Sequence, residues 1–157
     1  MTNPQIEKYL STQEIFSELN PEFIGFLAGC ASEREIAEGD FLFRQGEHAS
    51  KFYLVCDGRI AVEIPAITGP TLEVQSLGEG DALGWSWLIP PYKWNFQARA
   101  EEETDLLEFD GEAVLARCEQ EPEFGYELLK RFAALMSARL DAARQKIMDQ
   151  WNPAGFA

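Results

Sequence analysis

The spacing of apolar residues changes twice along the chain and divides it into three parts. In residues 1–34, apolar side chains recur three and four positions apart, which is typical of amphipathic helices. In residues 35–110 the period falls to two and glycines interrupt it, which indicates short strands joined by tight turns. In residues 111–151 the helical spacing returns. We therefore predict a single domain over residues 1–157, with helices on both sides of a strand-rich part.

Two helices are predicted before the strands. The second begins at Asn20-Pro21, because an asparagine cap followed by a first-turn proline is typical of a helix N-terminus, and it ends near Gly29. We expect both helices to pack on the strands. The apolar residues that define the first helix are Ile6, Tyr9, Leu10, Ile15, Phe16 and Leu19.

Six strands are expected in the middle part, over 41–44, 52–56, 60–64, 71–77, 96–100 and 105–109. Asp57-Gly58 lies between two of them and predicts a tight hairpin, because Asp-Gly supplies the positive φ angles that such a turn requires. Short strands at this spacing, with no helix between them, favour a closed or nearly closed antiparallel barrel.

A long helix is predicted from Pro122 to about residue 150, and it carries two apolar faces. Leu128, Phe132 and Leu135 form the first face, which is suited to lie on the barrel. The second face has a four-three heptad spacing, so we predict that it pairs with a second copy across a two-fold axis. The alternative is that both faces serve the core of one monomer. The residues assigned to the dimer helix are Leu129, Met136, Leu140, Ala143 and Ile147.

The composition narrows the classes of function. With 13 basic and 27 acidic residues the formal net charge is -14, which disfavours nucleic acid and anionic membranes as partners. No apolar run is long enough to span a membrane and no signal peptide is evident, so we expect a cytoplasmic protein. One histidine and three scattered cysteines, Cys30, Cys56 and Cys118, provide neither a metal site nor a catalytic relay. We therefore predict no enzymatic activity and no metal.

Residues 80–100, GDALGWSWLIPPYKWNFQARA, hold three of the four tryptophans of the chain: Trp85, Trp87 and Trp94. Each large aromatic side chain hides about 150–250 Å² when it is buried. A surface loop has no use for such a concentration, so these rings either fill a pocket or line one.

The order of these signals resembles the cyclic-nucleotide-binding domain family, as found in catabolite-activator-like regulators. The resemblance starts near residue 15. It implies a mostly β fold with flanking helices: a double-stranded β-helix, or jelly-roll barrel, with N-terminal helices and a long C-terminal helix. The segments that carry it are EGDFLFRQGEHASKFYLVCDGRIAVEI, Gly80-Asp81, Gly84, Ala98-Arg99-Ala100 and the long helix.

The resemblance fails at two positions that matter for chemistry. In the family, a glutamate holds the ribose hydroxyl and an arginine holds the phosphate. Aligned without gaps from Gly84 to Ala100, the glutamate falls on Trp85 and the arginine on Trp94. A buried phosphate without a charged partner loses several kcal/mol of compensation for its desolvation. We therefore expect ordinary cyclic AMP binding to be lost.

Other groups near this segment remain candidates for a ligand site. Backbone N–H groups of the Gly84 turn form a nest suited to an anion, and Lys93 or Arg99 supplies charge unless Arg99 pairs with residues 101–103. Trp85 and Trp94 either stack on a planar ligand or occupy its volume. The candidate ligand-binding residues are Gly84, Trp85, Ser86, Lys93, Trp94, Asn95 and Arg99.

Two functions remain open. The first is a stand-alone regulatory module that senses a small molecule, a cyclic nucleotide or another small anionic ligand, and signals through its C-terminal helix. The second is a ligand-independent dimerisation module that binds other proteins. No cofactor is assigned. Transcription factors of the family carry a helix-turn-helix domain beyond the long helix, where only residues 151–157 follow here, so we expect no direct DNA binding.

Overall fold

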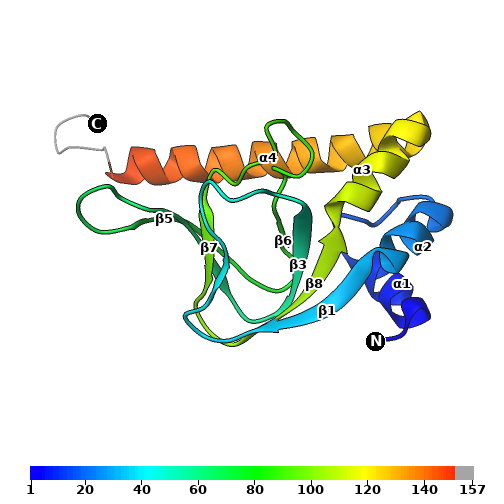
Figure 1. The fold of residues 1–157 in the computed structure, drawn as a ribbon, viewed down its shortest axis with the longest axis horizontal. Coiled ribbons are helices and arrows are strands. Elements are labelled where there is room, and N and C mark those ends of the chain that lie inside the picture. Colours follow the sequence, from blue (N-terminus) through cyan, green and yellow to red (C-terminus); the bar gives the residue numbers. More distant parts are fainter. Residues whose placement is uncertain (151–157) are drawn as a thin grey trace.

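The computed structural model describes residues 1–150, in which four helices pack against one end and one side of a roll of eight strands (Figure 1). Helices α1 (Asn3–Thr12) and α2 (Pro21–Gly29) precede the roll. Helices α3 (Gly111–Gln120) and α4 (Pro122–Gln150) follow it, and α4 lies along one side of the roll. Residue 151, the last of the predicted helical part, lies outside the described residues.

The strands form two four-stranded sheets in which every pairing is antiparallel. The predicted jelly-roll fold with flanking helices is confirmed. The first sheet has the order β1 (Ala31–Ile36), β8 (Thr104–Asp110), β3 (Lys51–Asp57) and β6 (Ala82–Leu83). The second has the order β2 (Phe41–Phe43), β7 (Gln97–Ala100), β4 (Ile60–Ile64) and β5 (Leu72–Leu77).

The hairpin expected at Asp57-Gly58 is wrong, because β3 and β4 belong to different sheets. The two residues form a corner at which the chain passes from one sheet to the other. Gly58 has a φ of 103°, and a Cβ added there would lie 2.4 Å from Oγ1 of Thr104. Thr104 holds the corner by accepting a hydrogen bond from the Arg59 N–H (3.1 Å). The glycine is thus required for a corner rather than for a hairpin.

The sequence does not predict β1, because residues 31–34 fall in the part of the chain with helical spacing. The sequence of β1, ASEREI, buries only Ile36, so it lacks the apolar alternation by which a strand is recognised. Tertiary pairing decides its conformation: β1 runs antiparallel to β8 in an unbroken register from Ala31 opposite Phe109 to Ile36 opposite Thr104.

Beyond α1, the apolar spacing predicts that the helix continues, but the structure has turns there. Residues 14–18 form turns, and Glu18 has a φ of 74°. Phe16 and Leu19 are nevertheless buried, because the turns direct them into the core that α2 and α4 cover. Apolar spacing correctly identified the buried positions here but not the backbone conformation.

The first face of α4 is buried as predicted. Leu128 and Phe132 are almost completely inaccessible, and the Phe132 ring meets Phe52 and Trp87 edge-on, with ring centroids 5.3 Å apart in each case. This aromatic cluster joins α4 to the roll and fixes the rotation of the helix about its own axis.

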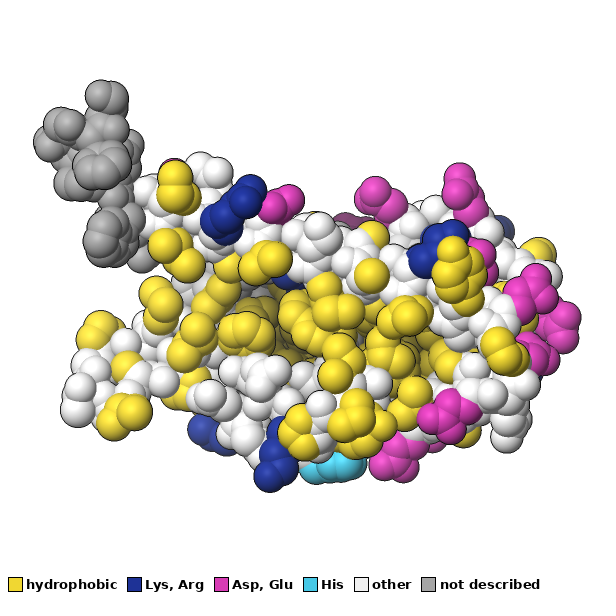
Figure 2. Space-filling view, turned by 90° about the horizontal axis from the view of Figure 1, so that it is seen from above, with side chains coloured by type: hydrophobic (Ala, Val, Ile, Leu, Met, Phe, Trp, Pro, Cys, Tyr) yellow, Lys and Arg dark blue, Asp and Glu magenta, His cyan; other side chains and the backbone are white. Residues whose placement is uncertain are grey.

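The second face of α4 is exposed in part, because Met136 and Ala143 are half-buried beside the roll. Leu129, Leu140 and Ile147 keep 49%, 70% and 60% of their surface accessible. In Figure 2 hydrophobic side chains gather in a band that runs along the length of the molecule. Within residues 1–150, none of the helices has an apolar stretch long enough to cross a bilayer.

Candidate functional site

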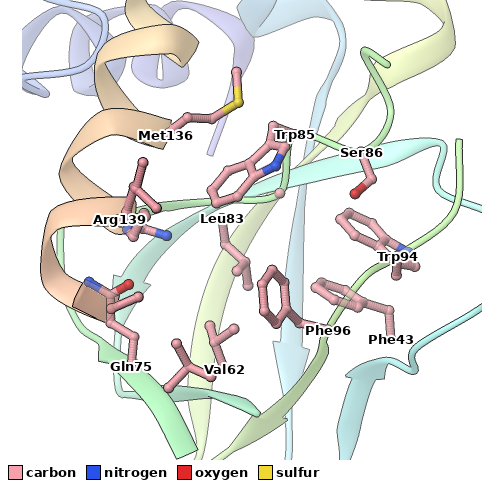
Figure 3. Close-up of a pocket in the computed structure, with 14 residues that line it drawn as sticks. Phe43, Val62, Gln75, Leu83, Trp85, Ser86, Trp94, Phe96, Met136 and Arg139 are labelled. Atoms are coloured by element: carbon pink, nitrogen blue, oxygen red, sulfur yellow. The ribbon is translucent and has the colours of Figure 1, made fainter. Parts of the chain in front are cut away.

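A cavity of about 180 Å³ lies between the roll and α4 (Figure 3). Strands of both sheets, the segment after β6 and one face of α4 provide its walls. Most of the lining side chains are apolar, and Gln75, Ser86 and Arg139 are the polar exceptions. The lining residues are Phe43, Val62, Val74, Gln75, Leu83, Gly84, Trp85, Ser86, Trp94, Phe96, Met136, Arg139, Leu140 and Ala143.

Trp94 fills one end of this cavity. Its ring stacks on Phe43 with the centroids 3.7 Å apart and the planes 11° from parallel. It also packs against Gly84, where an added Cβ would lie 2.8 Å from the Trp94 ring. Position 84 therefore requires glycine both for this close approach and for its φ of 101°. Backbone hydrogen bonds from Trp94 N to Glu47 O (3.0 Å) and from Gly46 N to Trp94 O (2.8 Å) hold the residue in place.

The other two tryptophans of the segment occupy different surroundings. Trp87 belongs to the core next to α4 and does not line the cavity: it stacks on Phe52 at 4.8 Å, and its Nε1–H donates to Gly84 O at 3.0 Å. Trp85 is half-buried and lines the cavity near Met136 (Figure 3). Trp94 and Trp85 therefore both line the cavity, where Trp94 occupies one end, and Trp87 anchors the turn between them.

The turn after Gly84 has no helix. Residues 86–88 form a single turn, closed by the Leu88 N–H, which donates to Trp85 O at 3.0 Å. Ser86 is buried and lines the cavity. The expected anion nest is thus reduced to one turn with a serine hydroxyl.

Arg99 does not reach the cavity. Its guanidinium donates to Glu63 from Nη2 (3.0 Å) and Nε (3.3 Å), and this pairing raises the Arg99 pKa. Glu63, on the neighbouring strand, is 7% exposed and also accepts a hydrogen bond from Gln97. The partner of Arg99 is therefore Glu63 and not the acidic residues 101–103.

Lys93 and Asn95 are exposed and lie outside the cavity lining. Lys93 is held by a backbone bridge to His48. Of the seven predicted ligand-binding residues, the structure brings Gly84, Trp85, Ser86 and Trp94 together around the cavity. Lys93, Asn95 and Arg99, which were predicted for their charge or polarity, do not join them.

Replacing Arg99 by alanine is expected to lower the free energy of unfolding by about 1–3 kcal/mol, because the buried Glu63 carboxylate loses its charge-assisted hydrogen bonds. Urea denaturation of both proteins measures the effect. Arg59→Ala is the matched control, since Arg59 pairs with Glu101 at 3.9 Å on the surface. Its loss is expected to change stability by less than about 0.5 kcal/mol. Equal effects of the two changes would contradict a buried role for the Arg99–Glu63 pair.

Arg139, on α4, is the charged cavity residue that sequence reasoning missed. Its Nη2 donates to Ala82 O, and burial lowers its pKa. Within the described part of the chain it makes no ion pair at 4.0 Å or less, although the charge of Asp81 partly offsets the lowering of its pKa. A signal existed: Met136, Arg139 and Ala143 recur three and four positions apart on one face of the helix. No carboxylate lines the cavity beside it.

Within residues 1–150, no group of three or more His, Cys, Asp or Glu side chains is placed so that it could hold a metal ion. The three cysteines are free and half-buried, and burial raises the pKa of each thiol. The cavity beside α4 is the candidate site.

Comparison with known proteins agrees with this geometry. The cyclic AMP receptor protein of Thermus thermophilus is 28% identical over 129 residues, which is 82% of this chain and 58% of that protein. A cyclic nucleotide-binding domain from Methylobacillus flagellatus superposes with a TM-score of 0.78 at 17% identity, covering 94% of this chain and 83% of that one. The sensor domain of the transcriptional regulator DNR from Pseudomonas aeruginosa superposes with a TM-score of 0.72 at 19% identity, covering 88% and 93%.

The chain thus spans somewhat more than half the length of the receptor protein that it matches. The family model described as cyclic nucleotide-binding domain matches residues 33–121, which extend from β1 to the end of α3. With the jelly roll, the glycine turn at the cavity and the long helix that closes it, this match shows that the chain belongs to the cyclic nucleotide-binding domain family.

Proposed function

We propose that the domain is a cytoplasmic, non-enzymatic sensor module that holds a small ligand in the cavity and signals through α4. The observation that supports it best is that α4 forms one wall of the cavity with Met136, Leu140 and Ala143. A ligand in this position contacts the roll and the helix together, so it favours whichever placement of α4 fits it best. Relatives described as a receptor protein and as a sensor domain have the same fold.

The output that we propose is a homodimer through α4. Leu140 lines the cavity and is also 70% exposed, so it lies at the mouth and faces outward as well. Leu129 and Ile147 extend the exposed stripe in both directions along the helix. Since ligand and partner helix would share Met136, Leu140 and Ala143, occupation of the cavity would alter the dimer directly.

Cyclic AMP is not the ligand that this cavity suits. Trp94 fills the end beside Gly84, and no carboxylate lines the cavity to hold a ribose hydroxyl. The same filling by Trp94 favours a second candidate function, a dimerisation module that binds other proteins without a ligand. The two functions differ in one measurable respect, namely whether the remaining space accepts a small molecule.

Indole tests the sensor function, because dry apolar cavities of about 150 Å³ bind small aromatic molecules. We expect indole at millimolar concentration to raise the thermal midpoint of the chain, and cyclic AMP and cyclic GMP at the same concentration to leave it unchanged. Val74→Phe, which adds bulk to the cavity wall on β5, is expected to weaken indole binding about tenfold or more. Calorimetric titration measures the affinities.

Leu72→Phe is the matched control. Leu72 lies on the same strand and is 48% exposed outside the cavity, so its replacement should leave indole binding unchanged. If the unaltered chain binds neither indole nor either cyclic nucleotide, the interaction module is favoured over the sensor as the function.

A further inference from the structure

We propose that the ligand of this cavity is a small amphipathic organic acid, with a planar apolar body in the cavity and one carboxylate held by Arg139. This inference rests on the proposed sensor function and specifies its ligand. It assigns to α4 the anion-binding role that the family resemblance places on the Gly84 to Ala100 segment.

The apolar walls of the cavity imply that the ligand has an apolar body. Leu83, Trp85, Phe96 and Met136 face the space that Trp94 leaves open (Figure 3). The volume of about 180 Å³ slightly exceeds the roughly 150 Å³ of a cavity that binds benzene. It therefore suits one or two fused rings with a short side chain. Flat rings gain most here, because aromatic walls provide stacking and edge contacts.

The hydrogen-bond partners of Arg139 imply that the ligand carries a carboxylate. The chain has 27 acidic residues, and Arg34, Arg59, Arg99 and Arg117 each lie within 4.0 Å of a carboxylate. Arg139 has only the neutral carbonyl of Ala82 as its hydrogen-bond partner in the described residues. The Asp81 carboxylate opposes the lowering of the Arg139 pKa by its charge, but it accepts a hydrogen bond from Gly78 N and makes none with Arg139. A half-buried guanidinium without a hydrogen-bonded counter-ion is costly, and an anion would complete its hydrogen bonds.

The polar groups are placed so that they orient such a molecule. Figure 3 shows Arg139 and Gln75 toward the α4 side of the cavity and Ser86 on the other side, next to Trp94. A carboxylate at Arg139, with the Gln75 amide as a further donor, places the rings between Trp85 and Phe96. Arg131, the other α4 arginine that pairs with no carboxylate among residues 1–150, donates to Ile15 O and does not line this cavity.

The test compares indole-3-acetate with indole-3-acetamide, which has the same shape without the charge. By calorimetric titration at neutral pH, we expect the unaltered chain to bind the acid about tenfold or more tighter than the amide, because a charge-assisted hydrogen bond is worth more than a neutral one. Arg139→Gln should bind the two equally. Arg144→Gln, which removes the same charge from an exposed site on α4, should keep the preference.

Each of the other possible results decides either the role of Arg139 or the sensor function. Equal binding of acid and amide by the unaltered chain overturns the role of Arg139 even if Arg139→Gln does not fold, and it leaves the sensor function intact. A preference for the acid that survives in Arg139→Gln also overturns it. If neither probe nor indole binds, the sensor function fails, and this inference fails with it.

Discussion

Replacing Trp94 by alanine will lower the free energy of unfolding by about 3–5 kcal/mol, which is the usual cost of removing a large buried aromatic ring. Trp94 is 6% exposed, and its ring is in contact with both Phe43 and Gly84. The backbone hydrogen bonds to Gly46 and Glu47 remain possible with alanine, so the loss reports the ring alone. Urea denaturation monitored by circular dichroism measures it.

Trp85→Ala is the matched control for this change. Trp85 comes from the same segment but is only half-buried, and its ring borders open space in the cavity. Its removal is expected to cost about half as much, in proportion to the apolar area removed. If Trp94→Ala costs no more than Trp85→Ala, the ring at position 94 does not fill a packed site, and the exclusion of cyclic AMP by Trp94 is wrong.

Replacing Leu140 by glutamate is expected to convert the proposed dimer into a folded monomer. Leu140 is 70% exposed, so the change removes little from the core of one chain. At a two-fold interface the two introduced carboxylates would lie near each other and lose hydration, which is expected to weaken association about a hundredfold or more. Sedimentation velocity gives the oligomeric state, and circular dichroism shows that the fold remains.

Gln145→Glu controls for the added charge. Gln145 is exposed on the same helix but lies on the opposite side from the Leu129, Leu140 and Ile147 stripe. This variant should remain dimeric. A monomeric unaltered chain would show that the exposed stripe of α4 has another partner, and would remove the proposed route from ligand to dimer.

The sequence by itself determined most of the architecture. The change of apolar period located the roll between two helical parts, and Asn20-Pro21 and Pro122 marked the beginnings of α2 and α4. It also identified the two faces of α4, of which the first is buried and the second is exposed at Leu129, Leu140 and Ile147. These features were readable because helix caps and apolar spacing depend on residues within one or two turns of each other.

Only the tertiary structure decided which strands pair and which charges meet. Asp57-Gly58 has the local signature of a hairpin, yet it joins strands of different sheets. Arg99 was chosen for the ligand site because it follows the Gly84 turn in the chain, but Glu63, 36 residues earlier, occupies its guanidinium. Arg139 enters the cavity instead, through the packing of α4.

The tryptophans show the same division. Their concentration in residues 85–94 indicated a pocket, whereas the choice between filling it and lining it depended on Phe43 and Gly84 for Trp94 and on α4 for Trp85. The sequence specifies the chemistry of each side chain. Its partner is set by long-range packing, because segments distant in the chain become neighbours only when the two sheets and α4 close on one another.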